Sequence, residues 1–463
     1  MDCSVVIPCL GGADLTAACL DSLRQQDAPH RLQVILVDNA GCDATAALAR
    51  RPGVEVLRQE RNLGFAGGCN RGLAHARSPF VLVLNNDTQA APGLLSRLER
   101  ALRRCDRIAF AAPISNRVKG PARIDCGDHG RTDAGRREIE RELCDPARDR
   151  VQDTDSLSGL CLLGRAATWR QLGGFDERFM PGNFEDDDLS LRARLFGHRL
   201  VIAGDAFLHH EAHRAFAALG IDMRTELERQ HAVFRGKWCA DPAGRAVLAA
   251  LGGDRDGAAA AAETARRLHP RWPDADWHLG RRLADQGRHE EAIPHLRALL
   301  QHSPMHPDAL VRLGECELRS GADPRTRARW RAALARCWFA SDQGANLLTR
   351  LGDHAWSTGD HEAAIADLRA AAELRPDDAA LQNRLGALLI ELRRFDEAIP
   401  VLERAAASGL ALAHTNLGIC HFHRGFGDLA LSHFARAAQQ LPDDPTAQDN
   451  YRRARAASGV GGC

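Results

Sequence analysis

The stretch Val81-Leu82-Val83-Leu84-Asn85-Asn86-Asp87 decides the fold, because its apolar run stops abruptly on three short polar residues. Such a run is typical of a buried strand that ends at the edge of a sheet. Two further runs, over residues 4–8 and 34–39, have the same form, and the second also delivers an acid, Asp38. The sequence therefore predicts Asp38 and Asp87 on one rim, which is where α/β sheets bind nucleotides.

The first half of the chain alternates strand-like and helix-like segments. The expected strands lie near 4–8, 32–38, 54–58 and 80–85, and the expected helices near 15–25, 44–51 and 67–76. This alternation predicts an α/β domain whose mostly parallel sheet has helices on both faces. Between Ser115 and Asp155 the pattern is lost, and we expect a mobile loop on the acceptor side of the site.

The second half of the chain carries Leu-Gly pairs at regular intervals. They begin at Leu279, Leu313, Leu351, Leu385 and Leu417, with spacings of 34, 38, 34 and 32 residues. A period near 34 is typical of tetratricopeptide helix pairs, which stack into an all-α solenoid. The predicted domains are an α/β domain over 1–238, a linker with a possible half-repeat over 239–274, the solenoid over 275–452 and a flexible tail over 453–463.

The composition excludes several classes of function. The 463 residues include 61 basic and 61 acidic side chains, so no long-range field favours nucleic acid or an anionic membrane. No apolar stretch approaches the ~18 residues of a spanning helix, and no leader pattern precedes the first strand. We therefore expect a cytoplasmic protein without an integral membrane segment. The 14 cysteines are scattered and form no CxxC pair, which favours reduced thiols over a zinc site.

Five motifs occur in an order that resembles the inverting sugar transferases of glycosyltransferase family 2. They are the strand ends at Asp38 and Asp87, the glycine-rich segment 61–70, the segment 173–179 and the acidic run 184–189. The resemblance covers roughly residues 1–238. It implies a GT-A fold that takes a sugar from a nucleoside-diphosphate-sugar, with a UDP-sugar expected, and inverts the configuration of the anomeric carbon.

Donor binding is expected at the ends of the first strands. Pro8 ends its strand without an N–H group, and Asp38 offers acceptor oxygens to a uracil N–H or a ribose hydroxyl, as the matching acid does in the family. The alternative is that Asp38 only caps the following turn. The glycines of segment 61–70 let backbone approach a ligand, and the resemblance implies donor contacts by Asn62 and Asn70.

The segment 85–87 stands in the place of the family's DxD motif. The resemblance therefore implies that Asn86 and Asp87 contact the donor and that Asp87 binds a divalent metal, Mn²⁺ or Mg²⁺. One carboxylate together with phosphate oxygens of the donor is a usual arrangement for these hard cations.

A second metal ligand is expected from a histidine near residue 210. His209 and His210 follow a strand-like segment, where a histidine of the family completes the metal shell, and His213 is a third candidate. An imidazole suits Mn²⁺ better than Mg²⁺. The alternative is a histidine pair in the core or on the surface.

Four consecutive carboxylates begin at Glu185. Asp188 can pair with Arg192 at the start of a helix that we predict from Leu189. Glu185 and Asp186 are expected before that helix, where crowded like charges raise at least one pKa. The resemblance places the catalytic base in this run, in a register that fits Asp186 best, with Glu185 beside it.

None of the five motifs identifies the surface that binds the acceptor. Trp169, Phe175 and Phe179 are candidates for an aromatic face against a sugar, with a core role as the alternative. Because stacked helix pairs form an extended groove, we predict a hexosyltransferase whose repeats hold a protein or peptide acceptor or a partner protein. Two alternatives stay open: a transferase for cell-surface polysaccharide or lipid-linked glycan, and an inactive scaffold that only binds nucleotide sugar.

Overall fold

The computed structural model divides the chain into two compact units, Met1–Ser320 and Gly321–Cys463, and each is described by itself. The predicted tail lies partly in the last helix, which ends at Ala457, while 458–463 lie outside the described residues. The described residues are 1–27, 31–39, 45, 47–127, 129–143, 150–211, 220, 222–321, 328, 330–332, 334 and 341–457.

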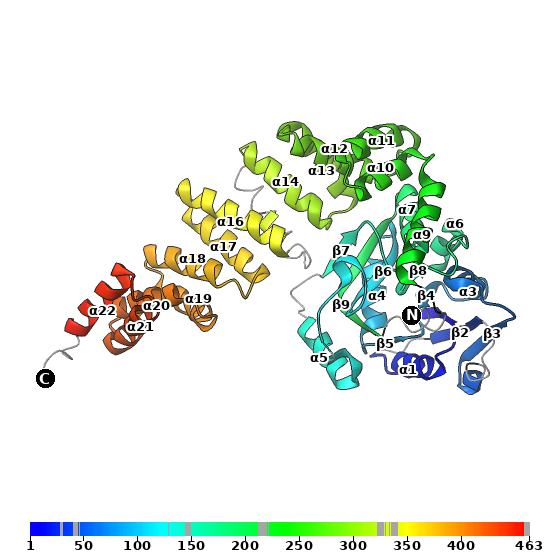
Figure 1. The fold of residues 1–463 in the computed structure, drawn as a ribbon, viewed down its shortest axis with the longest axis horizontal. Helices are drawn as coiled ribbons and strands as arrows, with labels where there is room; N and C mark the ends of the chain where they lie inside the picture. The colour runs from blue at the N-terminus through cyan, green and yellow to red at the C-terminus, as the bar shows by residue number, and fades with distance from the viewer. Residues whose placement is uncertain are drawn as a thin grey trace. The chain divides into compact units, whose positions relative to one another are not determined.

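A sheet of nine strands, counted over the described residues, forms the centre of the first unit (Figure 1). The strands are β1 Asp2–Cys9, β2 Arg31–Asn39, β3 Val54–Gln59, β4 Phe80–Leu84, β5 Thr88–Ala90, β6 Ile108–Ser115, β7 Val151–Thr154, β8 Cys161–Arg165 and β9 Arg199–His210. Their order is β3-β2-β1-β4-β8-β6-β9-β5, and β7 also pairs with β9. The strands from β3 to β4 are parallel, as are β6 and β9, whereas β8, β7 and β5 run antiparallel to their neighbours.

Helices connect these strands and cover the sheet (Figure 1). They are α1 Ala13–Arg24, α3 Gly64–Leu73, α4 Leu94–Arg103, α5 Asp133–Leu143, α6 Ala166–Leu172, α7 Glu185–Leu195 and α9 Met223–Trp238, with short 3-10 turns at Ala47–Arg50, Gly120–Ala122 and His129–Arg131. The predicted α/β class is confirmed. Within the predicted helix near 44–51 the structure has a 3-10 turn at Ala47–Arg50, and residues 44 and 46 lie outside the described residues.

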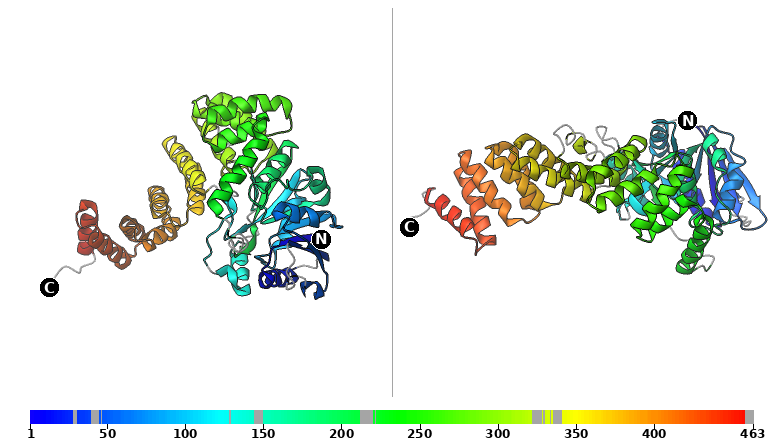
Figure 2. Two further views of the ribbon diagram at one scale, coloured as in Figure 1. Left: turned by 45° about the vertical axis from the view of Figure 1, so that its right-hand side comes forward. Right: turned by 90° about the horizontal axis from the view of Figure 1, so that it is seen from above.

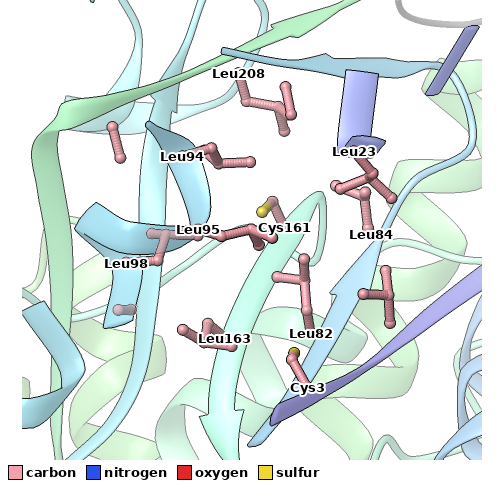
Figure 3. Packing of buried hydrophobic residues seen from close by; sticks show 14 of the residues in the cluster. Cys3, Leu23, Leu82, Leu84, Leu94, Leu95, Leu98, Cys161, Leu163 and Leu208 are labelled. Carbon is pink, nitrogen blue, oxygen red and sulfur yellow. The ribbon is translucent and has the colours of Figure 1, made fainter. Parts of the chain in front are cut away.

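Strand β1 is buried on both faces from Cys3 to Cys9, and its centre, Val5 to Ile7, is apolar. Val5 and Ile7 belong to the core formed with leucines of α1 and α4, and Figure 3 shows leucines of α4 and β4 meeting the side chains of β8 there. Val6 points to the opposite face, where a Cβ built on Gly72 of α3 would come 2.2 Å from its Cγ1. Successive strand residues alternate between faces, so helices on both sides explain the continuous run.

The segment from Ser115 to Asp155 is not the mobile loop that we predicted, as far as it is described. It contains α5, β7 and two 3-10 turns, and Ile139 is buried. Glu140 is buried too, and it accepts a hydrogen bond of 2.7 Å from Gly93 N. The sequence pattern missed this packing because polar side chains with partners, which carry no hydrophobic period, supply much of the burial.

Five helices follow α9 in the first unit and seven make up the described helices of the second, where Figure 2 shows them stacked in succession. None of the helices described is long and apolar enough to cross a membrane. The bounds are α10 Pro242–Leu251, α11 Arg255–Leu268, α12 Asp274–Asp285, α13 His289–His302 and α14 Pro307–Arg319, then α16 Ser341–Ser357, α17 His361–Leu374, α18 Ala379–Glu391, α19 Phe395–Ala407, α20 Ala411–His423, α21 Gly427–Gln440 and α22 Pro445–Ala457.

The recurring Leu-Gly pairs have a packing reason. A Cβ on Gly386 would come 2.4 Å from Leu402 Cδ2, and a Cβ on Gly418 would come 2.5 Å from Phe434 Cε1. In both cases the contact is 16 residues further along, on the second helix of the pair. The missing side chain therefore lets the two helices of a pair approach to a close-packed distance.

Candidate active site

The carboxyl ends of the parallel strands bring the predicted donor-side residues to one edge of the sheet. Pro8 lies opposite Val37 in the β1–β2 ladder, next to the buried carboxylate of Asp38. Asn86, just after β4, donates hydrogen bonds to Gly11 O at 3.3 Å and to Thr16 Oγ1 at 3.0 Å. The end of β4 is thereby joined to the turn that follows β1.

Asn39 holds the glycine-rich turn on the end of β2. Its Nδ2 donates to Gly64 O at 2.8 Å, and its Oδ1 accepts from Leu63 N at 2.9 Å. Asn62 supports the same turn, since its Oδ1 accepts from Gly64 N at 2.8 Å. Sequence reasoning missed Asn39, although its place directly after Asp38, like that of Asn86 after a strand end, was a usable signal.

Asn70 fastens the Gly-Gly-Phe turn to α3. Its Nδ2 donates to Phe175 O at 2.8 Å and to Glu177 Oε1 at 2.9 Å, and its Oδ1 accepts from Phe175 N at 2.9 Å. A Cβ on Gly174 would come 2.4 Å from this Oδ1, which explains the glycine. The donor contacts predicted for Asn62 and Asn70 stay predictions, and both amides have partners within the protein.

The predicted aromatic face is wrong. Trp169, Phe175 and Phe179 are at most 3% exposed. The indole Nε1 of Trp169 donates to Val81 O at 3.2 Å, and its ring packs 5.5 Å from that of Phe175. These rings fill the core beneath the site and present no face to a ligand.

Of the two predicted histidines, His210 is the one that reaches Asp87. Its Nε2 lies 3.3 Å from Asp87 Oδ1, because β9 pairs with β5 and sets His210 opposite Thr88. Asn116 Oδ1 accepts from His210 N at 2.8 Å, and the ring Nδ1 lies 2.7 Å from Arg117 O. Burial lowers the pKa of His210, but the hydrogen bond and charge of Asp87 outweigh it and raise that pKa above 6.5.

His209 points away from Asp87. Its ring is buried, and its Nε2 lies 3.2 Å from Glu211 Oε1. Burial is the largest influence on its pKa, which is lowered. The third candidate, His213, lies outside the described residues.

Asp87 and His210 fit a divalent cation as a set of two ligands. In the described part of the chain, no group of three or more His, Cys, Asp and Glu side chains is arranged to hold a metal. A carboxylate oxygen and an imidazole nitrogen at this separation suit Mn²⁺, with oxygens of a diphosphate to complete the shell. Two residues before Asp87 in the chain, Asn85 Oδ1 is buried and has no hydrogen-bond partner among the residues described.

Helix α7 begins at Glu185, and the predicted start at Leu189 is wrong. Glu185 and Asp186 lie in its first turn, since carboxylates are stabilised at a helix N-terminus. The predicted pair of Asp188 with Arg192 is confirmed, with Nε 2.8 Å from Oδ2.

Asp188 is a structural residue of this run. It is fully buried, accepts a hydrogen bond of 2.9 Å from Trp238 Nε1 and pairs with Lys237 Nζ at 2.5 Å. Its charge is thus neutralised by α9 as well as by its own helix.

Asp186 has the environment of a general base. Burial and the charge of Asp187 raise its pKa to about 6, against the opposing effect of a 2.9 Å hydrogen bond from Gly159 N to its Oδ2. The pKa of Glu185 is raised well above its usual value by burial and then by the charge of Asp186. Near neutral pH, a carboxyl group with a pKa of about 6 is mostly ionised yet still has useful proton affinity, which suits Asp186 to proton transfer.

Residues 159–160 join Asp186 to the segment that carries Asp87. Gly159 N bonds Asp186, and Leu160 O accepts from Asn85 N at 3.0 Å. The dipeptide Gly159-Leu160 therefore contacts both the predicted base, Asp186, and the strand end that leads to the predicted metal ligand, Asp87. Lys119 adds positive charge near Asp186, where it acts to lower that pKa.

Comparisons with known proteins match both parts of the chain. Glycosyl transferase family 2 matches residues 4–143, and the tetratricopeptide repeat matches 244–301, 278–341, 349–411 and 388–445. The chain is 31% identical over 229 residues, 43% of its length and 72% of the relative, to an N-acetylglucosaminyl-diphospho-decaprenol L-rhamnosyltransferase of Mycobacterium tuberculosis. It is 29% identical over 118 residues, 25% of its length and 33% of the relative, to the succinoglycan biosynthesis protein ExoO of Rhizobium meliloti.

Solved structures resemble each half only loosely. A structure of GalNAc-T7 with UDP, GalNAc and Mn²⁺ aligns with a TM-score of 0.37 and 14% identity over 46% of this chain and 44% of that one. The MamA protein aligns with a TM-score of 0.27 and 20% identity over 37% and 92%. On the strength of the sequence matches, the chain belongs to glycosyl transferase family 2 and carries tetratricopeptide repeats in its second half.

Proposed function

We propose that this glycosyltransferase inverts the anomeric carbon of a nucleoside-diphosphate-sugar, with Asp186 as general base and with Asp87 and His210 on the side of the diphosphate. The proposal rests on two properties of Asp186, the pKa of its carboxyl group and the hydrogen bonds that hold both of its oxygens. Its pKa of about 6 matches proton transfer near neutral pH, and its hydrogen bond from Gly159 fixes one oxygen while the other faces its own helix terminus, where Asp187 N donates to it at 2.9 Å.

The reaction balances with these groups. Asp186 takes the proton of an acceptor hydroxyl while that oxygen attacks the anomeric carbon on the face opposite the diphosphate. The bond from the anomeric carbon to the diphosphate oxygen breaks, and its electron pair leaves with the nucleoside diphosphate. The proton remains on Asp186 until solvent removes it, and the sugar is delivered with inverted configuration.

A bound Mn²⁺ or Mg²⁺ would neutralise the charge that develops on the leaving diphosphate. Asp87 and His210 would hold it, since they supply oxygen and nitrogen donors 3.3 Å apart. Asn86 and Thr16 keep the segment of Asp87 fixed against the turn after β1. Asp38 and Pro8 remain our candidates for contacts with the nucleoside.

Two classes of acceptor are supported by different observations. The repeats occupy much of the second half, and stacked helix pairs form grooves that suit a polypeptide, so a protein or peptide acceptor is our first proposal. The second is a lipid-linked sugar diphosphate, because the Mycobacterium tuberculosis relative is named for such an acceptor and aligns over 72% of its length. In that case the repeats bind a partner protein.

A donor panel tests the proposal. Release of nucleoside diphosphate from each candidate donor is measured with full-length protein, with and without Mn²⁺, and the preferred donor is then offered to peptides and to polyprenyl-diphosphate sugars. Transfer that depends on Asp186 supports the enzyme, and the labelled product identifies the acceptor class. Donor binding without release or transfer by the wild type would instead indicate a scaffold that binds nucleotide sugar.

A further inference from the structure

The far end of α7, the helix that carries Asp186, is fastened to the repeat helices of the first unit. Arg194, in its last turn, forms a buried ion pair with Asp274, the first residue of α12. Asp274 also accepts a hydrogen bond of 2.9 Å from Trp272 Nε1. Just beyond α7, His302 Nε2 lies 3.0 Å from Gly197 O. Both α12 and α13 therefore hold this end of the helix.

The same repeats hold the end of β7. Asp153 Oδ2 accepts from Met305 N at 2.9 Å, and Asp153 N donates to Met305 O at 3.2 Å. Asp155 Oδ1 lies 3.2 Å from His306 Nε2 and 3.4 Å from Arg194 Nη1. The turn between α13 and α14 thus grips residues 153 and 155 through two consecutive residues of its own.

From this grip the chain runs directly along the first turns of α7. Ser156 Oγ donates to Asp187 Oδ1 at 2.7 Å, and Leu157 N donates to Ser190 Oγ at 3.1 Å. Gly159 N then donates to the carboxylate of Asp186 at 2.9 Å. Only three residues separate Asp155 from Gly159, and each spans at most about 3.6 Å, so a shift at one end of this strap reaches the other.

We propose that Asp155 and His306 are positioning residues for sugar transfer: the turn between α13 and α14 fixes the strap of residues 155–159, and the strap orients the carboxylate of Asp186. This inference rests on the proposed role of Asp186. It gives the first repeats a part in the reaction itself, separate from any acceptor or partner bound by the repeats of the second unit. The competing reading is that these contacts only fasten the repeats to the sheet.

Kinetics of full-length His306→Gln and Asp155→Ala variants test the proposal. We expect kcat for transfer to fall fivefold or more, while KM for the donor stays within twofold. The acid limb of the kcat profile should move to higher pH, because a weakened bond from Gly159 lets Asp186 keep its proton longer. A purely structural role would not move that limb. His295→Gln is the matched control, since His295 pairs with Asp276 at 2.7 Å within the repeats and should leave kinetics unchanged.

Unaltered kcat and an unaltered acid limb in the folded variants would overturn the inference. The inference would also be overturned if activity fell only in proportion to the amount of folded protein while the acid limb of the kcat profile kept its pH. If His306→Gln does not fold, Asp155→Ala decides, because the Asp155 side chain is 47% exposed and its removal leaves Arg194 paired with Asp274. Asp186→Asn is measured in parallel: if it keeps full turnover the proposed base is wrong, and if it alone loses turnover only the positioning role fails.

Discussion

The imidazole of His210 lies 3.3 Å from the carboxylate of Asp87, whereas the ring of the adjacent His209 points to Glu211. Two neighbouring residues of one type therefore have different surroundings, on opposite faces of β9. The contact of His210 with Asp87 links β9 to the segment after β4. His209 and His210 also offer a matched pair of substitutions at adjacent positions.

We expect His210→Ala to lower the rate of transfer at limiting Mn²⁺ by about tenfold or more. A tenfold loss corresponds to an activation free energy higher by roughly 1.4 kcal/mol, caused here by the loss of one metal ligand. The concentration of Mn²⁺ needed for half-maximal rate should rise. His209→Ala should lower the melting temperature, because it empties a buried site, yet leave the Mn²⁺ dependence as it is. Titrations of rate against Mn²⁺ for both variants check this, and equal effects would contradict the assignment of His210.

Asp87→Ala should abolish transfer and metal-dependent donor binding without unfolding the protein, since this rim carboxylate lies outside the core. The loss is expected to be on the order of 3 kcal/mol or more, about a hundredfold in rate. Rates with excess EDTA and after re-addition of Mn²⁺ give an independent measurement. Full activity of the wild type in EDTA would exclude the metal role.

Asp186→Asn should reduce turnover by about 10²–10⁴-fold while donor binding persists. Its melting temperature at pH 7.5 should be equal to or above that of the wild type. The pKa of Asp186 is about 6 in the folded protein and 3.8 in a free aspartate. The protonated carboxyl group therefore stabilises the folded state below pH 3.8, and this stabilisation is lost as the pH rises through 6. Melting curves from pH 4 to 7.5 should show the difference growing with pH.

Asp188→Asn should have the opposite signature. Its carboxylate is fully buried between Arg192, Lys237 and Trp238, so removal of the charge takes the carboxylate partner of Arg192 and one of the two partners of Lys237, which still pairs with Asp176. Such losses typically cost about 3–5 kcal/mol of stability. Turnover per folded molecule should change little. A stable Asp188→Asn with lost turnover would move the base to this residue.

The rate of transfer should depend on a group that titrates near pH 6. Because Asp186 acts as a base, activity should rise with pH through its pKa of about 6 and fall about tenfold per unit well below it. Profiles of kcat/KM against pH report this group in the free enzyme. The inflection should be absent from the residual activity of Asp186→Asn, and its persistence there would assign it to another group.

Truncations should distinguish the repeats of the two units. A chain ended at residue 274 loses Met305 and His306, so we expect poor solubility and weak donor hydrolysis. A chain ended at Ser320 keeps these contacts and should hydrolyse donor like the full chain. If the repeats beyond Ser320 hold the acceptor, its KM should rise tenfold or more, about 1.4 kcal/mol of binding. An unchanged KM would favour a partner-binding role.

Local sequence patterns were enough to predict the strand ends, the repeats and the acidic run. The buried strand leaves a continuous apolar run from Val81, and the close packing of the helix pairs leaves Leu-Gly pairs at a regular period. The choice between His209 and His210 depends on strand register, and β9 shifts its register against β6 near Pro113, so it could not be counted from the sequence. The start of α7 likewise depends on Phe184, which has a positive φ of 69°, and the order of polar and apolar residues does not predict that conformation.

The contacts that the sequence did not predict are mainly those between polar residues far apart in the chain. Asp153 and Asp155 meet Met305 and His306 through side-chain and backbone hydrogen bonds that follow no period along the chain. Asn39 and Asn70 were similar cases, in which a short amide fastens a turn from another part of the sequence. Such contacts are determined by tertiary geometry, and a single sequence does not record which partners meet.

The ion pair between Arg194 and Asp274 also bears on how chains of this kind arise by recombination. A crossover placed where the repeat pattern starts, near residue 244, would give the transferase foreign helices and leave Arg194 buried beside an unmatched surface. A crossover after Ser320 separates two units that each keep their own core. Homologues should accordingly vary in the number of repeats beyond that point, while the helices α10 to α14 are inherited together with the sheet.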